Sequence, residues 1–224
     1  MSVIQLKQIS IAYPDGGSKT EVLRGLSLDV RQGDTVAITG PSGSGKSTLL
    51  SILGTLLRPD SGEYFFDGMD MEQLDDAARA KFRNQSIGFI FQDHRLLPQF
   101  TARENILLPV LAGQPQTTKE QEERADYLMC ATDMAAHAHK YPEQLSGGEC
   151  QRVAICRAVI MKPRLLLADE PTGLLDAASA ERITDLLLSI NASESCTLLM
   201  VTHAERVAQK AGKTYRLQNG KLFE

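Results

Sequence analysis

Residues 35–47 read TVAITGPSGSGKS, and this stretch decides the fold. Its opening part, residues 35–39, is apolar or β-branched and lies between Gly33 and Gly40, which is typical of a buried strand. Residues 46–57 then have the composition of a helix, which stops at a turn around Pro59. Strand, glycine-rich loop and helix in this order predict a loop that binds phosphate.

The loop itself, GPSGSGKS at residues 40–47, fits the pattern GxxxxGK[ST] at every fixed position. Its glycines allow backbone N–H groups to turn inward around phosphate oxygens, and the following helix adds the positive end of its dipole. Lys46 is expected to reach the β- and γ-phosphates of a nucleotide, and the Ser47 hydroxyl is expected to ligate Mg²⁺.

Further strands and helices alternate along the chain. Residues 87–91, 165–168 and 197–201 read as short buried strands, and apolar residues at helical spacing over 183–190 predict an amphipathic helix. This order predicts an α/β fold with a parallel sheet that is covered on both faces.

The two ends of the chain differ from that core. Residues 3–11, 22–30 and 64–67 alternate apolar and polar side chains, which predicts half-exposed antiparallel strands. Residues 214–223 contain Asn-Gly at 219–220 between short apolar segments, a strong hairpin signal.

Residues from about 93 to 157 contain no convincing strand and are predicted to be mostly helical. Thr117 and Glu120 form a possible capping box, which would open a helix that runs through Met129.

Composition excludes several classes of protein. The chain has 224 residues with a net charge of −4, which argues against a nucleic-acid binder that relies on neutralising phosphates. No apolar run is long enough to span a bilayer, and no secretory signal is recognisable, so a cytosolic location is expected. The four cysteines form no CxxC pair, which favours buried or incidental thiols over a zinc site or a disulfide framework.

Two carboxylates end the apolar run 165–168. Asp169 is expected to hold the Mg²⁺ shell, and Glu170 is expected to polarise the attacking water. Gln92 and His203 likewise follow predicted strands, at the edge where open α/β sheets bind ligands. By position alone, each of these two is more readily a surface glutamine or a satisfied histidine.

The remaining histidines carry no predicted role. His94, His137 and His139 are predicted to be surface residues, because no metal-ligand partners for the pair at 137 and 139 are recognisable in the sequence.

The stretch LSGGE at residues 145–149 precedes a predicted helix over about 149–159, so it is similar to a second anion-binding helix start. Together with the phosphate loop and the carboxylate pair, it resembles the ATP-binding cassette (ABC) family over essentially the whole chain. The resemblance implies a single domain over 1–224. Its P-loop NTPase (RecA-like) core would carry an N-terminal antiparallel β subdomain and an inserted helical subdomain at about 93–157. It also implies that two copies form a head-to-tail homodimer around two ATP molecules, with nearly inactive monomers.

The family pattern assigns further roles residue by residue. Gln92 matches the glutamine that senses Mg²⁺ and the γ-phosphate, and His203 matches the histidine that contacts the γ-phosphate. Tyr13 matches the aromatic residue that stacks on adenine, although a core tyrosine is the alternative. Glu170, His203, Gln92 and Lys46 are the implied catalytic residues, and Ser47, Gln92 and Asp169 the Mg²⁺ ligands. The residues implied to bind nucleotide are Tyr13, Gly40, Pro41, Ser42, Gly43, Ser44, Gly45, Lys46, Ser47, Thr48, Ser146, Gly147, Gly148, Glu149 and Asp176.

Residues 84–98 and 167–173 resemble the lipoprotein-releasing group of LolD and MacB, with the cell-division ATPase FtsE nearly as close. This resemblance implies separate integral membrane permease subunits, membrane contact through these partners only, no nucleic-acid partner, and a place on the cytoplasmic face of the inner membrane. Leu96, Leu97 and Phe100 would either receive a partner's coupling helix or pack inside the helical region. A soluble ABC-type ATPase acting on nucleic acid or ribosomes is the less favoured alternative.

Three residues depart from the group's pattern. Cys150 replaces a polar residue, Cys156 replaces a small one in what we interpret as a near-isosteric packing change, and Leu174 stands where the group has asparagine.

Overall fold

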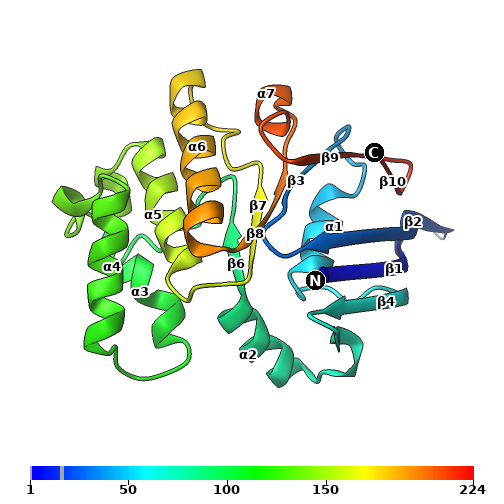
Figure 1. Ribbon diagram of the computed structural model, residues 1–224, viewed down its shortest axis with the longest axis horizontal. Helices are drawn as coiled ribbons and strands as arrows, with labels where there is room; N and C mark the ends of the chain where they lie inside the picture. The colour runs from blue at the N-terminus through cyan, green and yellow to red at the C-terminus, as the bar shows by residue number, and fades with distance from the viewer. Residues whose placement is uncertain (1, 16–17) are drawn as a thin grey trace. The chain divides into compact units, whose positions relative to one another are not determined.

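The computed structural model describes residues 2–15 and 18–224, and the chain divides into two compact units (Figure 1). One unit comprises the chain up to Arg83 together with Thr197–Glu224, and the other comprises Asn84–Cys196. The strands are β1 (Ser2–Asp15), β2 (Ser18–Arg31), β3 (Thr35–Thr39), β4 (Ser61–Phe66), β5 (Met69–Asp70), β6 (Ile87–Ile90), β7 (Leu165–Asp169), β8 (Thr197–Val201), β9 (Lys213–Gln218) and β10 (Lys221–Phe223). The helices are α1 (Lys46–Leu53), α2 (Asp76–Ser86), α3 (Ala102–Leu111), α4 (Lys119–Ala131), α5 (Gly147–Val159), α6 (Ala177–Glu194) and α7 (Glu205–Ala208), with short 3₁₀ turns at Met71–Gln73, Ala135–His137 and Pro142–Gln144.

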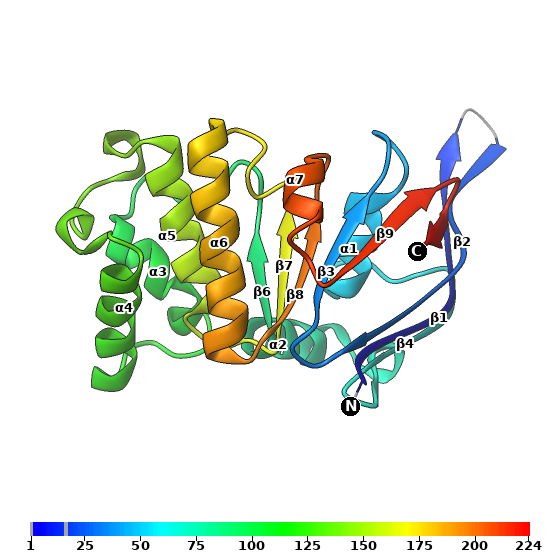
Figure 2. The same ribbon diagram turned by 45° about the horizontal axis from the view of Figure 1, so that its top comes forward.

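The first unit contains the predicted antiparallel sheet, in the order β2-β1-β4-β5 (Figure 2). Alternate residues of β1 such as Ile4 and Leu6 are fully buried, which is what the alternating pattern requires of a sheet with one core face. Tyr64 of β4 donates from its hydroxyl to Leu53 O at 2.7 Å, so the buried phenol has a partner at the end of α1. Burial raises the pKa of this tyrosine.

The same unit contains the phosphate-loop strand. Strand β3 runs parallel to β8 on one side and parallel to β9 on the other. β9 turns back into β10 through Asn219 and Gly220, both with positive φ, which confirms the predicted hairpin. α1 is shorter than predicted: it ends at Leu53 instead of residue 57, because Gly54 caps it and Thr55 adopts a left-handed conformation with φ of 55°.

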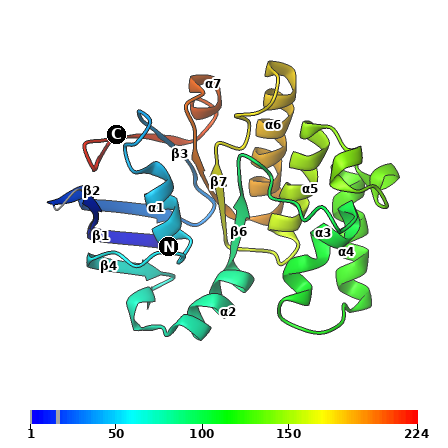
Figure 3. The same cartoon turned by 180° about the vertical axis from the view of Figure 1, so that it is seen from behind.

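The second unit combines the parallel pair β6–β7 with helices α3 to α6 (Figure 3). Gly88 of β6 explains how closely α5 approaches this pair. A Cβ atom at residue 88 would lie 2.3 Å from Ala158 O, so only glycine lets the helix backbone approach the strand. α6 begins at Ala177, earlier than its apolar stripe indicated.

The start of α4 corrects a predicted capping box. The cap is Thr118 with Gln121, one residue later than the predicted pair Thr117 and Glu120. Thr118 has the extended backbone that an N-cap requires and accepts from Gln121 N, whereas the Thr117 hydroxyl bonds the Glu122 side chain at 2.6 Å. Among the described residues, no helix is both long and apolar enough to cross a membrane.

Candidate nucleotide site and signature helix

The phosphate loop depends on glycine at two positions. Gly40 has φ of 150°, and a Cβ atom there would lie 2.3 Å from Leu217 O. Gly45 is left-handed with φ of 100° and forms the N-cap of α1, where a Cβ atom would lie 2.9 Å from Val22 Cγ1. Other residues would be strained or would clash here, so the sequence pattern has a direct structural cause.

Polar groups of the loop face inward. Lys46 is buried, and its Nζ donates to Gly40 O and Pro41 O at 2.9 Å each. The Ser44 hydroxyl oxygen is buried and has no hydrogen-bond partner among the described residues. No acidic residue occupies the first turn of α1, so nothing neutralises the positive helix end. An ammonium, an unused hydroxyl and a free helix start suit a polyphosphate.

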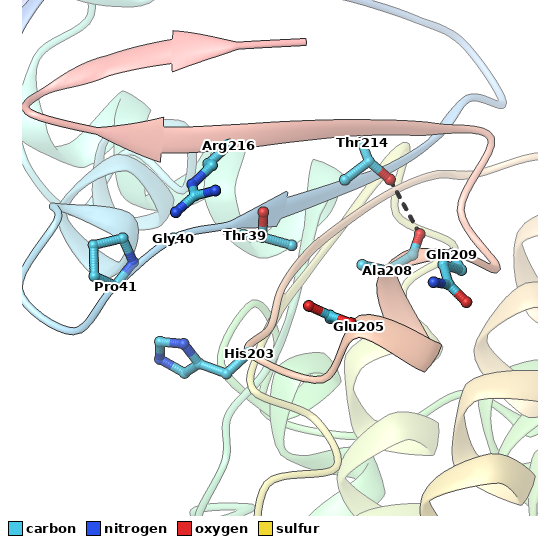
Figure 4. A pocket seen from close by; sticks show the side chains of 9 residues that line it. All are labelled: Thr39, Gly40, Pro41, His203, Glu205, Ala208, Gln209, Thr214 and Arg216. Carbon is cyan, nitrogen blue, oxygen red and sulfur yellow. Dashed lines mark hydrogen bonds between the residues drawn. The ribbon is translucent and has the colours of Figure 1, made fainter.

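His203 lies at the same edge as this loop. The register of β3 and β8 pairs Ile38 with Val201, so Gly40 and His203 each lie two residues beyond this pair. A pocket of about 550 Å³ opens there (Figure 4). It is lined by Thr39, Gly40, Pro41, His203, Glu205, Ala208, Gln209, Thr214 and Arg216.

Arg216 is a candidate residue that sequence reasoning missed. β9 pairs with β3 so that Arg216 is opposite Thr39, immediately before the phosphate loop. Residues 214–218 were predicted as a strand, but only the pairing of β9 with β3 brings the guanidinium to the pocket (Figure 4).

Tyr13 lies on β1, and its side chain is 41% exposed. This exposure rules out the alternative of a core tyrosine. The loop that follows contains residues 16 and 17, which lie outside the described residues.

The carboxylate pair and Gln92 are brought together in the second unit. The parallel register pairs Ile90 of β6 with Ala168 of β7, so Gln92 and Glu170 are each two residues further along. A Cβ atom at Gly173 would lie 2.9 Å from Gln92 Nε2, so the glutamine amide lies against the segment after the carboxylates. Glu170 has φ of 46°, an uncommon backbone conformation that occurs often at functional sites.

The predicted Mg²⁺ ligands form a suitable donor set. Ser47, Gln92 and Asp169 offer a hydroxyl, an amide oxygen and a carboxylate, which are the oxygen ligands that Mg²⁺ takes. Within the described part of the chain, no group of three or more His, Cys, Asp or Glu side chains could hold a metal ion. An ion held by the predicted set would therefore take its remaining oxygens from nucleotide phosphates and water.

The LSGGE stretch at residues 145–149, which we call the signature, lies at the start of α5. Ser146 is the N-cap: its hydroxyl accepts from Glu149 N at 3.4 Å and donates to Glu149 Oε2 at 2.7 Å. Ser146 N also donates to that carboxylate, at 2.6 Å, and these bonds from Ser146 hold the pKa of Glu149 below its ordinary value. Ser146 and Gly147 are exposed, so this second helix start is open at the surface.

The signature lies beside the start of α6. A Cβ atom at Gly147 would be 3.8 Å from Leu175 Cδ2, and one at Gly148 would be 3.9 Å from Ser179 Oγ. Asp176 caps α6 by accepting from Ser179 N at 3.0 Å, and the bonds from Ser179 lower the pKa of its carboxyl. Leu174, one of the three residues that depart from the group's pattern, is 67% exposed just before this cap.

Comparison with known proteins agrees with this geometry. A family model described as ABC transporter matches residues 23–173. The chain belongs to the ABC transporter family. The chain is therefore an ATP-binding cassette that hydrolyses ATP. These matches confirm the P-loop NTPase fold and the ATPase activity that the motifs predict.

Curated relatives place the cassette within the predicted group. It is 47% identical over 221 residues to the lipoprotein-releasing system ATP-binding protein LolD 1 of Rhodopirellula baltica, covering 98% of this chain and 96% of that protein. It is 46% identical to the macrolide export ATP-binding/permease protein MacB of Syntrophobacter fumaroxidans, covering 98% of this chain and 31% of that protein. The predicted resemblance to the LolD and MacB group is confirmed.

A solved structure has the same fold as this chain. The dimeric ATP-binding cassette MJ0796, described as a post-hydrolysis state bound to ADP and Pi, superposes with a TM-score of 0.90 at 37% identity and covers 99% of this chain and 97% of that chain.

His137 lies only partly at the surface. Its side chain is 25% exposed, and its Nε2 lies 3.2 Å from Glu149 Oε1, a contact that was not predicted from the sequence. The 3₁₀ turn Ala135–His137 brings the imidazole to the first turn of α5. Helical periodicity gives no signal for such a contact, because the two partners lie twelve positions apart and do not belong to one helix.

His94 is also partly buried, and hydrogen bonds hold it in place. Its side chain is half-buried, and burial lowers the pKa of its imidazole. Nδ1 accepts from Leu96 N at 3.4 Å, and the carbonyl oxygen of His94 accepts from Arg157. Arg157 was not identified from the sequence, since an arginine in a helix ordinarily indicates only a polar face.

The segment that could receive a partner's coupling helix, residues 96–100, is partly buried and partly exposed. Leu96 is 8% exposed and belongs to the packing of its unit, whereas Leu97 is 39% exposed. Asn105, which is fully buried, accepts from Leu97 N at 2.8 Å and donates to Leu97 O and Phe100 O. The amide of Asn105 therefore fixes the backbone that presents Leu97 at the surface.

The cysteines are mostly buried, as predicted. Cys150 lies 3.6 Å from Pro142 O, and Cys156 contacts the Thr132 hydroxyl at 3.2 Å. Burial raises the pKa of Cys156 and of Cys196 to about 11, and Cys130 is exposed. These surroundings support the near-isosteric interpretation of Cys156.

Proposed function

We propose that this cassette is the ATPase subunit of a lipoprotein-releasing transporter of the LolD type. Two copies dimerise head-to-tail around two ATP molecules and drive a separate membrane permease. The observation that carries the proposal is the presence of two anion-binding helix starts on one chain. One of them, α1, has Lys46 in its loop; the other, α5, is open at the surface and has no lysine of its own in its first turn.

The proposed roles follow from the chemistry of each group. Lys46 and the loop 40–48 bind the triphosphate of one copy, Tyr13 stacks on the adenine, and Glu170 polarises the attacking water. When bound, Mg²⁺ neutralises charge on the β- and γ-phosphates. Gln92 and His203 are the proposed contacts to the γ-phosphate. Gln92 follows the pairing of β6 with β7, and His203 follows the pairing of β3 with β8.

The second copy completes the site. Ser146, Gly147 and Gly148, with the start of α5, approach the γ-phosphate held by the opposite phosphate loop, and Asp176 lies beside them. The dimeric MJ0796 structure, bound to ADP and Pi, supports this arrangement. One subunit alone would then hold nucleotide without hydrolysing it efficiently.

The proposed membrane partner follows from the relatives. LolD-type relatives match the chain over nearly their full length, whereas in MacB the matched region is 31% of a protein named as both ATP-binding and permease. By analogy with the LolD relatives, which are named as ATP-binding proteins of a lipoprotein-releasing system, we propose that integral membrane permease subunits hold the cassette at the cytoplasmic face of the inner membrane. The exposed Leu97 is a candidate contact for that partner.

A variant at the signature tests the dimeric mechanism. Ser146→Arg should abolish hydrolysis while leaving the ATP affinity of the isolated monomer unchanged, because the signature serves the other copy. Thr118→Arg is the matched control, since Thr118 caps α4 through an equivalent capping box and carries no proposed role in nucleotide binding. Weaker ATP binding by the Ser146→Arg monomer would show that the signature acts within its own chain.

Co-purification from membranes tests the partner. Recovery of a permease with a large extracytoplasmic domain supports the lipoprotein-releasing assignment. Recovery of a division-associated membrane protein instead would move the cassette to the FtsE type.

A further inference from the structure

Glu149 places a carboxylate beside a proposed phosphate site. Its Oε2 accepts from both Ser146 N and the Ser146 hydroxyl, at 2.6 and 2.7 Å. The hydroxyl hydrogen that would be offered to a phosphate is therefore directed at Glu149. A negative charge next to an anion site is also unfavourable unless another group compensates it.

His137 supplies that compensation through the other carboxylate oxygen. Its Nε2 lies 3.2 Å from Glu149 Oε1, and the two side chains are only 25% and 21% exposed. The two oxygens of Glu149 thus have separate partners: Ser146 on one and His137 on the other. Lys140 adds a more distant positive charge, which acts on the Glu149 carboxylate through space.

The surroundings of the imidazole favour one tautomer. Nδ1 of His137 is buried and has no hydrogen-bond partner among the described residues. A proton on Nδ1 would be buried without an acceptor, so the proton of the neutral ring belongs on Nε2, the nitrogen that faces Glu149. The ring therefore presents an N–H group to the carboxylate even when it is uncharged.

We propose that His137 is a positioning residue for the signature: it holds the Glu149 carboxylate in place, offsets its charge, and so frees the Ser146 hydroxyl for a phosphate. A carboxylate whose charge is already offset at one oxygen by His137 is a weaker acceptor on its second oxygen, so the Ser146 hydrogen can turn to the phosphate at lower cost. The inference rests on the proposed function, because it assumes that the signature binds a phosphate of the second copy.

Substitution of His137 separates this role from simple packing. His137→Ala should lower kcat for ATP about tenfold, the effect of losing one partly buried contact to a charged group. The monomer should remain folded, and its affinity for ATP should not change. His137→Gln should restore most of the rate, because its amide nitrogen can occupy the place of Nε2, whereas the shorter His137→Asn should not.

His139→Ala is the matched control, since His139 is exposed and only two residues away. An unchanged kcat in His137→Ala would overturn the inference. So would a loss of rate that His137→Gln fails to restore, or one that accompanies weaker ATP binding by the monomer. If Ser146→Arg behaves as proposed and His137→Ala has no effect, only this inference fails; if Ser146→Arg weakens ATP binding in the monomer, the proposed function fails as well.

Discussion

Arg157 of the signature helix donates from Nη2 to the carbonyl oxygen of His94 at 2.6 Å. Its Nη1 donates to the next carbonyl, that of Arg95, also at 2.6 Å. The two accepting residues have φ of 48° and 47°, so Arg157 stabilises two consecutive left-handed residues that begin two positions after Gln92. The guanidinium thus ties α5, which begins at the signature, to the segment that carries the sensing glutamine.

Replacing this guanidinium should disturb both stability and turnover. The single ammonium of a lysine cannot reproduce the forked geometry in which two guanidinium nitrogens donate to two carbonyl oxygens. Arg157→Lys should therefore lower the free energy of unfolding by about 2 kcal/mol. It should also lower kcat roughly tenfold or more, because Gln92 loses its fixed backbone support. Urea unfolding and steady-state hydrolysis measure the two effects.

Arg103→Lys serves as the control, since it alters an ion pair with Asp126 in which the carboxylate is 60% exposed. If Arg157→Lys had no greater effect than Arg103→Lys, the tie between α5 and the Gln92 segment would be unimportant.

Glu170→Gln should retain ATP binding and trap a dimer. The neutral amide cannot accept a proton from the attacking water, so kcat should fall by about 10²–10⁴-fold. The hydrolysis rate and size-exclusion chromatography with ATP provide the measurements. Glu120→Gln is the control, because Glu120 is an exposed residue of α4. Retained turnover in Glu170→Gln would exclude this glutamate as general base.

Gly88→Ala should push α5 away from β6. The added methyl would lie 2.3 Å from Ala158 O, a backbone atom that cannot move alone. Overpacking of this kind costs about 1–3 kcal/mol, and a displaced signature helix should also lower turnover. At Gly113 the nearest atom would be at 3.6 Å, so Gly113→Ala should be close to neutral in the same denaturant titration.

Thiol reactivity should separate Cys130 from Cys156 and Cys196. With both pKa values at about 11, the last two carry almost no thiolate at pH 8, and burial also shields them from reagents. In native protein at pH 8, a thiol reagent should modify the exposed Cys130 first, and all four thiols should react in denaturant. Rapid modification of Cys156 in the native protein would contradict the described packing.

The strands β3 and β8 match their sequence predictions residue for residue. Short apolar runs between turn residues are a local signal, and so are the glycine loop and the Asn219-Gly220 hairpin. Helix ends were less accurate. α1 stops at Gly54 because Thr55 turns left-handed, and α4 starts after Thr118, choices that depend on backbone conformation more than on composition.

The sequence by itself determined the family, the phosphate loop and the types of side chain at the site, because glycine, lysine and carboxylate requirements are imposed by phosphate chemistry at fixed spacing. Only the tertiary structure decided which side chains support them. Arg216 reaches the pocket through the pairing of β9 with β3, Arg157 reaches the carbonyls after Gln92, and His137 reaches Glu149. These contacts join residues far apart in the chain, and they depend on the register of strands and the approach of helices, which no local pattern encodes.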